Sequence, residues 1–198
     1  MWEEAARRLA GRLVVLEPLA LRHEQGLWEA ANDPEVWRWM LWNAIASRED
    51  FHDWVEEALA QSRAGERIPF AVLTAADEQP IGSSSYLALR PEHRGLEIGW
   101  TWMARATWGT RANVEAKLLL MKHAFERLGC MRVEFKTDAR NERARAALAA
   151  LPGRFEGVFV KHMLVRDGEV RDSAWYSVTD DEWPDVKTAL TARLAARS

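Results

Sequence analysis

The stretch from Thr107 to Lys117, TWGTRANVEAK, has the outline of a turn that leads into a helix. The residues that follow, LLLMKHAFERLG, are largely apolar and helix-forming. The first amides of a helix lack partners within it and lie at the positive end of its dipole, so such a turn can bind phosphate. Phosphate loops are usually rich in glycine, however, and this turn has only Gly109 together with Arg111. Taken alone, the stretch fits either an anion site or a plain helix start.

Four other side chains are of reactive types, but each also has an ordinary structural interpretation. His123 and His162 lie in segments of structural character, and we expect packed or surface residues there. Cys130 follows the end of a predicted helix and is expected to be a small buried apolar residue. Tyr176, in the last predicted hairpin, has a phenol hydroxyl that could act as an acid towards a bound molecule.

The segments around these residues show the hydrophobic periodicity of an α/β chain. Apolar or alternating runs predict strands at 13–16, 70–73, 81–89, 96–102, 131–137, 155–165 and 174–178. Amphipathic patterns and capping residues predict helices through 27–31, from 47 to 65, over 107–128 and 141–151, and from 179 through 194. We therefore expect one α/β domain over residues 1–198, without internal repeats or a long linker.

The predicted strand over 96–102 alternates apolar with polar or small residues. A regular strand points successive side chains to opposite faces, so the apolar even-numbered residues should share one face. The odd-numbered residues Glu97, Gly99 and Thr101 should share the other.

The composition argues against several classes of function. The 198 residues carry a formal net charge of -3 with both signs interspersed, which does not indicate binding to nucleic acid or to a membrane surface. The N-terminus lacks a signal-peptide hydrophobic region, and no apolar run reaches membrane-spanning length. Cys130 is the only cysteine, which rules out an intrachain disulfide and a cysteine-rich zinc site. We expect a cytoplasmic protein without a metal.

Tryptophan is the unusual residue in this chain, with 11 copies against two tyrosines. Seven of them fall into two groups: Trp37, Trp39, Trp42 and Trp54, then Trp100, Trp102 and Trp108. Such groups either line a pocket or a subunit contact, or they are simply part of the core, which is the commoner case.

The element order after residue 68 is strand, strand, strand, helix, strand, helix, strand, strand, and it comes with the segments LEIGW, WGTRANVEA, HAFERLG, RVEFKTDARNERARAAL and EG. This combination resembles the GNAT superfamily of N-acetyltransferases, and most closely its branch of ribosomal-protein N-terminal acetyltransferases. The resemblance covers nearly the whole chain, from GRLVVLEPL and NDPEVWRW to DEWPDVKTAL, and rests on order, spacing and length. It implies a mixed central sheet of about seven strands with a V-shaped splay, flanked by helices on both faces.

The resemblance also implies that acetyl-CoA lies between the strands at 96–103 and 131–137. Its pantetheine arm would run along Thr101, Trp102 and Met103. Its pyrophosphate would rest on the backbone amides of Trp108, Gly109, Thr110, Arg111, Ala112 and Asn113. The family pattern in this turn is Gln or Arg, two residues, Gly, one residue, then Gly or Ala. Trp108, Arg111 and Asn113 replace these three residues, and Arg111 would add a cation for the phosphate.

Acetyl transfer needs a group that takes the amine proton. By resemblance Glu97 is the first choice and Glu156 the second, although Glu97 also fits a solvated or structural strand residue. Asn141 opens the second helix, where it would reach the cofactor arm or serve only as an N-cap. Ala144 stands where the family usually has a serine that acts as general acid, but a thiolate whose thiol has a pKa of about 8.5 leaves tolerably without one.

The predicted function is acetyl-CoA-dependent N-acetylation of a primary amine by direct attack on the thioester. The acceptor would be a protein N-terminus or a small amine such as an antibiotic, polyamine or amino acid, and a homodimer is left open. We expect an apolar, aromatic acceptor pocket built from the 37–54 region and the last hairpin. The alternative is a catalytically weakened GNAT-fold module that binds CoA or another protein. The identity of the amine does not follow from the sequence.

Overall fold

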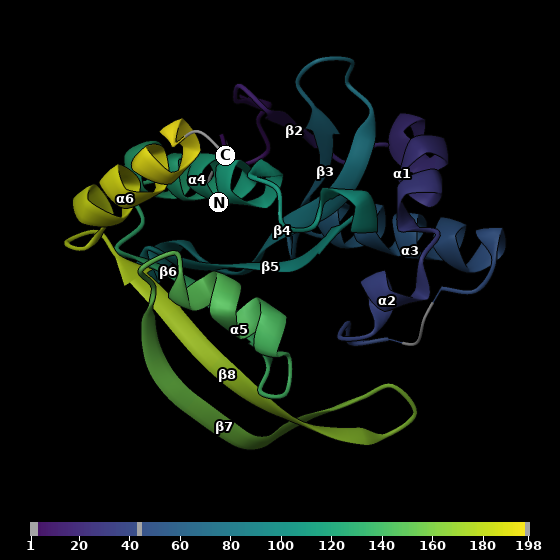
Figure 1. Cartoon of the computed structure of the whole chain (residues 1–198). Coiled ribbons are helices and arrows are strands. Elements are labelled where there is room, and N and C mark those ends of the chain that lie inside the picture. The colour runs from purple at the N-terminus through teal and green to yellow at the C-terminus, as the bar shows by residue number, and fades with distance from the viewer. Residues whose placement is uncertain (1–3, 43–44, 197–198) are drawn as a thin grey trace.

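A computed structural model describes residues 4–42 and 45–196 of the chain. Its centre is a sheet of eight strands in the order β1-β2-β3-β4-β5-β6-β8-β7 (Figure 1). The strands are β1 (Leu9–Ala10), β2 (Val14–Pro18), β3 (Ile68–Thr74), β4 (Pro80–Arg90), β5 (Gly95–Met103), β6 (Arg132–Asp138), β7 (Arg154–Val165) and β8 (Glu169–Thr179). The mixed sheet was expected with about seven strands, and the eighth is the two-residue β1, which is too short to show a periodicity.

The helices are α1 (Glu24–Ala31), α2 (Pro34–Trp37), α3 (Arg48–Arg63), α4 (Ala112–Glu126), α5 (Glu142–Ala149) and α6 (Trp183–Ala195). Local capping explains several of their ends. Ser47 and Asp50 form a reciprocal capping box at the start of α3, and Asp33 caps α2 ahead of Pro34. The helix expected from residue 107 begins only at Ala112, because the preceding residues form a short 3-10 turn and a loop.

The helices cover the two faces of the sheet with separate cores. α4 and α6 pack on one face, around Leu96, Leu120 and Leu190. On the opposite face lie α1, α2 and α3, around Trp37 and Phe51. In Figure 1 these two groups of helices stand on opposite sides of the strands, while the long β7–β8 hairpin extends past α5. Both cores together indicate one α/β unit built on a single sheet.

The sheet opens in its centre, between β5 and β6 (Figure 1). These two strands are parallel and pair only at Gly95 with Arg132, Leu96 with Val133 and Glu97 with Glu134. Every other neighbouring pair in the sheet is antiparallel. Beyond Glu97 the two strands share no further register pairs among the described residues, so the sheet has the splay that the resemblance implied.

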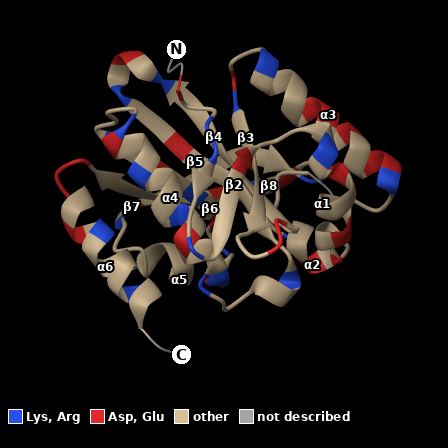
Figure 2. Ribbon diagram, turned by 90° about the horizontal axis from the view of Figure 1, so that it is seen from above, with Lys and Arg blue, Asp and Glu red and all other residues tan. Residues whose placement is uncertain are grey.

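Charged residues of both signs are spread over the ribbon (Figure 2). Basic and acidic segments alternate along α3 and the neighbouring loops, and no broad face of one sign is seen in this view. Over the described ranges, none of the helices has the length and apolar character needed to cross a bilayer.

Candidate functional site

Glu97 lies on β5 at the last register pair before the strands part. Its carboxylate is almost fully buried and forms an ion pair of 2.9 Å with the Lys136 ammonium on β6. Burial raises the pKa of Glu97, and the field of Lys136 opposes this effect. A buried carboxylate with a raised pKa is a better proton acceptor than an exposed one.

A bulge in β5 determines which of its side chains share a face with Glu97. Trp100 has a positive φ of 47°, and the β4–β5 register shifts on either side of Ser85–Leu87. A non-glycine residue adopts such a conformation only when its surroundings enforce it, and a bulge of this kind reverses the later side chains. The even-odd alternation expected over 96–102 is therefore wrong beyond Gly99.

The consequence is that the two ends of β5 exchange faces. Leu96 and Ile98 belong to the core beneath α4, as does Met103, an odd-numbered residue. Trp102 belongs to the core of α1 to α3, and Trp100 packs against that core. Glu97 is thereby on the same side as Trp100, and both line one cavity.

This cavity has a volume of about 360 Å³ and lies over the splay, on the face that α3 covers. It is bounded by Leu41, Gln61, Glu66, Arg67, Leu87, Ala88, Glu97, Trp100, Lys136 and Met163. The expected regions contribute, with Leu41 from the segment after α2 and Met163 from the last hairpin. Apolar side chains and the Trp100 ring share this lining with four charged residues, Glu66, Arg67, Glu97 and Lys136.

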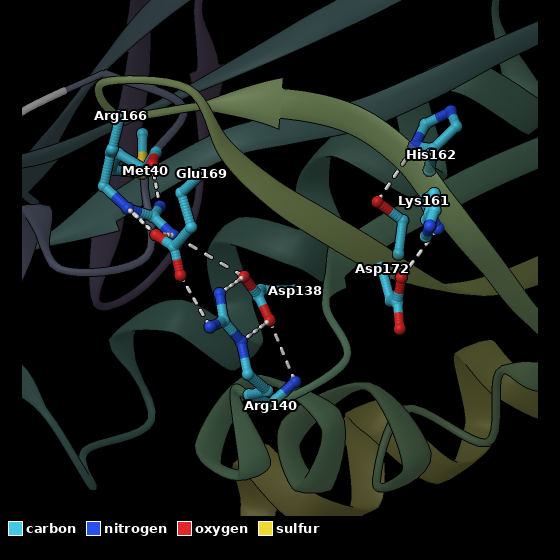
Figure 3. Close-up of polar contacts among 9 residues, drawn as sticks. Met40, Asp138, Arg140, Lys161, His162, Arg166, Glu169 and Asp172 are labelled. Atoms are coloured by element: carbon cyan, nitrogen blue, oxygen red, sulfur yellow. Dashed lines mark hydrogen bonds and ion pairs between the residues drawn. The ribbon is translucent and has the colours of Figure 1, made fainter.

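An ionic cluster fastens the hairpin that closes one side of this cavity (Figure 3). Arg166, at the hairpin turn, donates to the backbone carbonyl of Met40 and forms ion pairs with Asp138 and Glu169. Arg140 bridges the same two carboxylates. The Arg166 backbone amide donates to the Leu41 carbonyl at 3.1 Å. The loop after α2 and the hairpin turn are thus held together. The loop supplies Leu41 to the cavity wall, and β7, the strand that leads into the turn, supplies Met163.

Most of the tryptophans are core, as the commoner interpretation holds. Trp37 is fully buried and contacts the rings of Trp42, Trp54 and Trp102 at centroid distances of 5.3–6.5 Å. Six of the seven tryptophans in the two sequence groups therefore belong to or pack against one core, while the Trp39 ring lies against Arg38 and Arg140. Trp100 is the member that reaches the cavity.

The turn before α4 leaves several backbone amides free. Gly109 has a φ of 75°, a conformation that favours glycine, and the Thr110 hydroxyl caps the Ala112 amide at 3.3 Å. The amides of Gly109, Arg111, Asn113 and Val114 donate to no acceptor in the part of the chain that the structure describes. The turn therefore offers the unpartnered donors that an anion requires.

The Arg111 side chain of this turn differs from expectation. The Arg111 guanidinium donates to the carbonyls of Leu194 and Ala196 at 2.9 and 2.8 Å, so it closes the end of α6 rather than standing free for a phosphate. The Asn113 side-chain oxygen is buried without a donor among the described residues. Trp108 donates to the Met103 carbonyl, and the Arg143 guanidinium of α5 covers its ring at 3.3 Å.

Lys117 is a buried cation that was not recognised from the sequence. It lies on α4, donates to the Thr101 hydroxyl at 2.8 Å, and sits 5.5 Å from the centre of the Phe135 ring. Its contacts thus come from both strands of the splay, and burial lowers its pKa to about 7. The helical period gave a signal, because Lys117 precedes the buried Leu120 and Met121 by three and four residues.

Asn141 and Glu156, the other two candidate side chains, have different structural environments. Asn141 is buried and caps α5, accepting from the Ala144 amide at 3.1 Å. Glu156 on β7 makes a two-pronged ion pair with Arg132 and accepts from Ser177, and these contacts lower its pKa. It does not line the cavity of Glu97. As a proton acceptor Glu156 is therefore the weaker of the two carboxylates.

The other reactive side chains have structural partners. His123 is buried and forms a hydrogen bond with the Glu4 carbonyl, and His162 forms one with the Ser173 hydroxyl. Cys130 is buried, which raises its pKa to about 12. Tyr176 accepts from Arg145 of α5 within the core beneath α4, on the side of the sheet away from the cavity.

Comparison with known proteins agrees with this arrangement. Residues 13–151 match the model of an acetyltransferase (GNAT) domain. A GCN5-related N-acetyltransferase from Brucella melitensis is 32% identical, with a TM-score of 0.88, and 94% of this chain and 85% of that one are covered. A protein from T. thermophilus assigned as an acetyltransferase is 42% identical, with a TM-score of 0.86 and coverage of 95% and 97%.

A third solved structure, of Mycobacterium smegmatis RimJ in complex with CoA-disulfide, is 23% identical, with a TM-score of 0.78 and coverage of 94% and 91%. At this identity the likeness concerns the fold alone. No match was found among the curated proteins.

Proposed function

Because the chain belongs to the GNAT family of acetyltransferases, which use acetyl-CoA, we propose that it acetylates a primary amine with Glu97 as the proton acceptor. The observation that carries this proposal is the position of Glu97. It is a buried carboxylate at the start of the splay, and it lines a cavity on the face opposite α4.

The splay itself supports binding of the cofactor arm between β5 and β6. Strands that part leave amides and carbonyls without partners in the sheet, and an extended ligand can bond to them as an added strand does. We place the arm along Thr101, Trp102 and Met103. Thr101 fits this position, because its hydroxyl is held by Ser84 and Lys117 at 2.8 Å each.

The free amides before α4 support the placement of the pyrophosphate at residues 108–113. Backbone donors and the positive end of a 15-residue helix would bind this group. We assign the binding to the amides, since the Arg111 side chain is committed to α6. Asn141 would approach the arm from the start of α5.

The reaction then needs few side chains. The neutral amine attacks the thioester carbonyl, the carbon–sulfur bond breaks, and Glu97 takes the amine proton directly or through water. The positive charge of Lys136 opposes the effect of burial and favours the ionised form of Glu97 before the amine enters. Ala144 supplies no proton to the sulfur, and the thiolate, whose thiol has a pKa of about 8.5, leaves as the anion.

The test is release of free CoA from acetyl-CoA across a panel of peptides and small amines, with calorimetry for CoA binding. We expect CoA to bind and at least one amine to be acetylated. Binding without thiol release from any amine would instead favour a binding module, and absence of CoA binding would contradict the proposal altogether.

A further inference from the structure

Arg67, which directly precedes β3, is a buried arginine without a carboxylate partner. Only 3% of its surface is exposed, and burial lowers its pKa to about 10. No Asp or Glu of the described ranges lies within ion-pair distance, and Glu57, whose field it feels, is itself exposed. Burying a cation costs free energy unless an anion compensates it.

One edge of the guanidinium lacks strong hydrogen-bond acceptors. Its Nε donates to the Ser85 hydroxyl at 2.8 Å. Its Nη1 reaches the Gln61 side-chain oxygen only at 3.5 Å, the limit of a hydrogen bond. Its Nη2 is buried and has no acceptor among the described residues. A carboxylate can bind this Nη1–Nη2 edge with two parallel hydrogen bonds, and the other bidentate edge is partly used because Nε donates to Ser85.

Arg67 and Glu97 line the same cavity. The charge of Glu97 is paired there with Lys136. Glu66, the other acid of the lining, is exposed, and no ion pair joins it to Arg67 among the described residues, so the buried guanidinium has no carboxylate in contact with it. Arg171 makes a useful contrast. It is buried too, but it does not line the cavity, and the fields of Asp138 and Glu97 favour its charge.

The rings around Arg67 hold it in place without neutralising it. Its Cζ lies 4.4 Å from the centre of the Trp100 ring and 5.8 Å from that of Trp54. Stacking on aromatic rings stabilises a guanidinium by its face and leaves its in-plane donors to other groups. The rings therefore fix the orientation of the Arg67 guanidinium, and its Nη groups still lack strong hydrogen-bond acceptors.

We propose that the acceptor is a primary amine that also carries a carboxylate, with Arg67 binding the carboxylate while the amine faces Glu97. This inference rests on the proposed acetyl transfer. The carboxylate would displace the weak contact of Gln61 and supply both Nη groups with acceptors. A cavity of about 360 Å³ is at the small end of the range for ligand pockets, so a free amino acid suits it better than a bulky amine.

The experiment compares matched pairs of acceptors: amino acids against their amides, and peptides with an acidic against an amide first side chain. Thiol release from acetyl-CoA is measured for the wild type, Arg67→Met and Arg67→Lys, with calorimetric CoA binding for each. Arg63→Met, an exposed arginine at the end of α3, is the matched control.

For the wild type we expect kcat/KM to be at least about tenfold higher for the carboxylate member of the responding pairs, the usual scale for a charged hydrogen bond. Arg67→Met should reduce this ratio towards one, Arg67→Lys should keep part of it, and Arg63→Met should leave it unchanged. A higher kcat/KM for free amino acids than for peptides would identify free amino acids as the class of acceptor.

The proposal is wrong if the wild type binds CoA and acetylates amines without regard to a carboxylate, or if it acetylates other amines but none of these pairs. It is equally wrong if the preference survives in a folded Arg67→Met variant that binds CoA normally. Thiol release from no amine at all, or failure of the wild type to bind CoA, would instead overturn the acetyl transfer on which the inference rests.

Discussion

At the scale of single residues, Glu97 combines burial with an ion pair. Glu97→Gln keeps the size of the side chain and removes its basic oxygen. Since general base catalysis contributes about 10²–10⁴-fold, we expect turnover to fall at least about tenfold while CoA affinity holds. Glu92→Gln, at an exposed position before β5, is the control. Unchanged turnover would place the base elsewhere, with Glu156 next in line.

The pH profile tests the same residue independently. Burial raises the pKa of Glu97, so the rate should fall with decreasing pH at values above the usual glutamate range. This acid limb of kcat/KM should disappear in Glu97→Gln for a given amine. A limb that persists in the variant would belong to another group.

Lys117 makes the stability of the protein depend on pH. Its pKa is about 7 in the fold against a usual value of 10.5, so between these values the unfolded chain holds a proton that the folded chain lacks. The free energy of unfolding should therefore rise with pH across this window, by up to about 1.4 kcal/mol per unit. It should fall progressively as pH decreases from 10.5 to 7 and change no further on account of Lys117 below pH 7, where both states hold the proton.

Lys117→Met tests this expectation, because methionine has a similar length and no charge. At pH 6 the variant should be more stable than the wild type, and the difference should shrink towards pH 10. The measurement is denaturant unfolding as a function of pH, with the exposed Lys122→Met as control. A variant less stable than the wild type at pH 6 would show that Lys117 is held charged at little cost.

At the scale of elements, the turn before α4 separates two kinds of binding. Gly109→Val should weaken CoA binding, because φ of 75° is strained for a β-branched residue. Arg111→Ala should affect CoA binding little and instead lower the free energy of unfolding by about 1 kcal/mol, because two carbonyls at the end of α6 lose their donor.

Calorimetric titration with CoA and with pantetheine lacking phosphate, alongside unfolding measurements, distinguishes the two effects. If both ligands bind the wild type equally well, the pyrophosphate is not held at this turn. If Arg111→Ala loses CoA affinity without losing stability, its side chain does bind the phosphate.

The elements were predictable wherever a local pattern determines them. Ser47 with Asp50 fixed the start of α3, and the period of two identified β6. The bulge at Trp100 was not predictable, since it depends on pairing with the neighbouring strand rather than on the local sequence. Because the residues beyond a bulge change faces, the faces of Thr101 and Trp102 were assigned wrongly.

The candidate site likewise contains residues that could be predicted from the sequence and residues that could not. Glu97, Asn141 and the turn at 108–113 came from the sequence through a family resemblance that depends on order and spacing. Arg67 did not, because its partners Ser85 and Trp100 lie on other strands and are adjacent only in the folded sheet. Buried charges of this kind are defined by tertiary contacts, which a single sequence does not display.

At the scale of the whole molecule, the central splay divides the sheet into two halves that β5 and β6 join by three register pairs. A ligand bound in the gap should connect these halves, since it contacts both strands. At a CoA concentration 100 times its Kd, binding to the folded state alone adds about 2.7 kcal/mol to the free energy of unfolding. For a chain of this size we expect Tm to rise by roughly 5–10 °C.

Hydrogen exchange should show where this stabilisation acts. Saturating CoA should slow exchange in β5 beyond Glu97, in β6 and in the first turn of α4, because amides left unpaired by the splay and by the helix start become donors to the ligand. β2 and β3, on the far side of β4, should change little and serve as the internal control. Protection confined to α6, or spread evenly over the sheet, would mean that CoA binds outside the gap between β5 and β6.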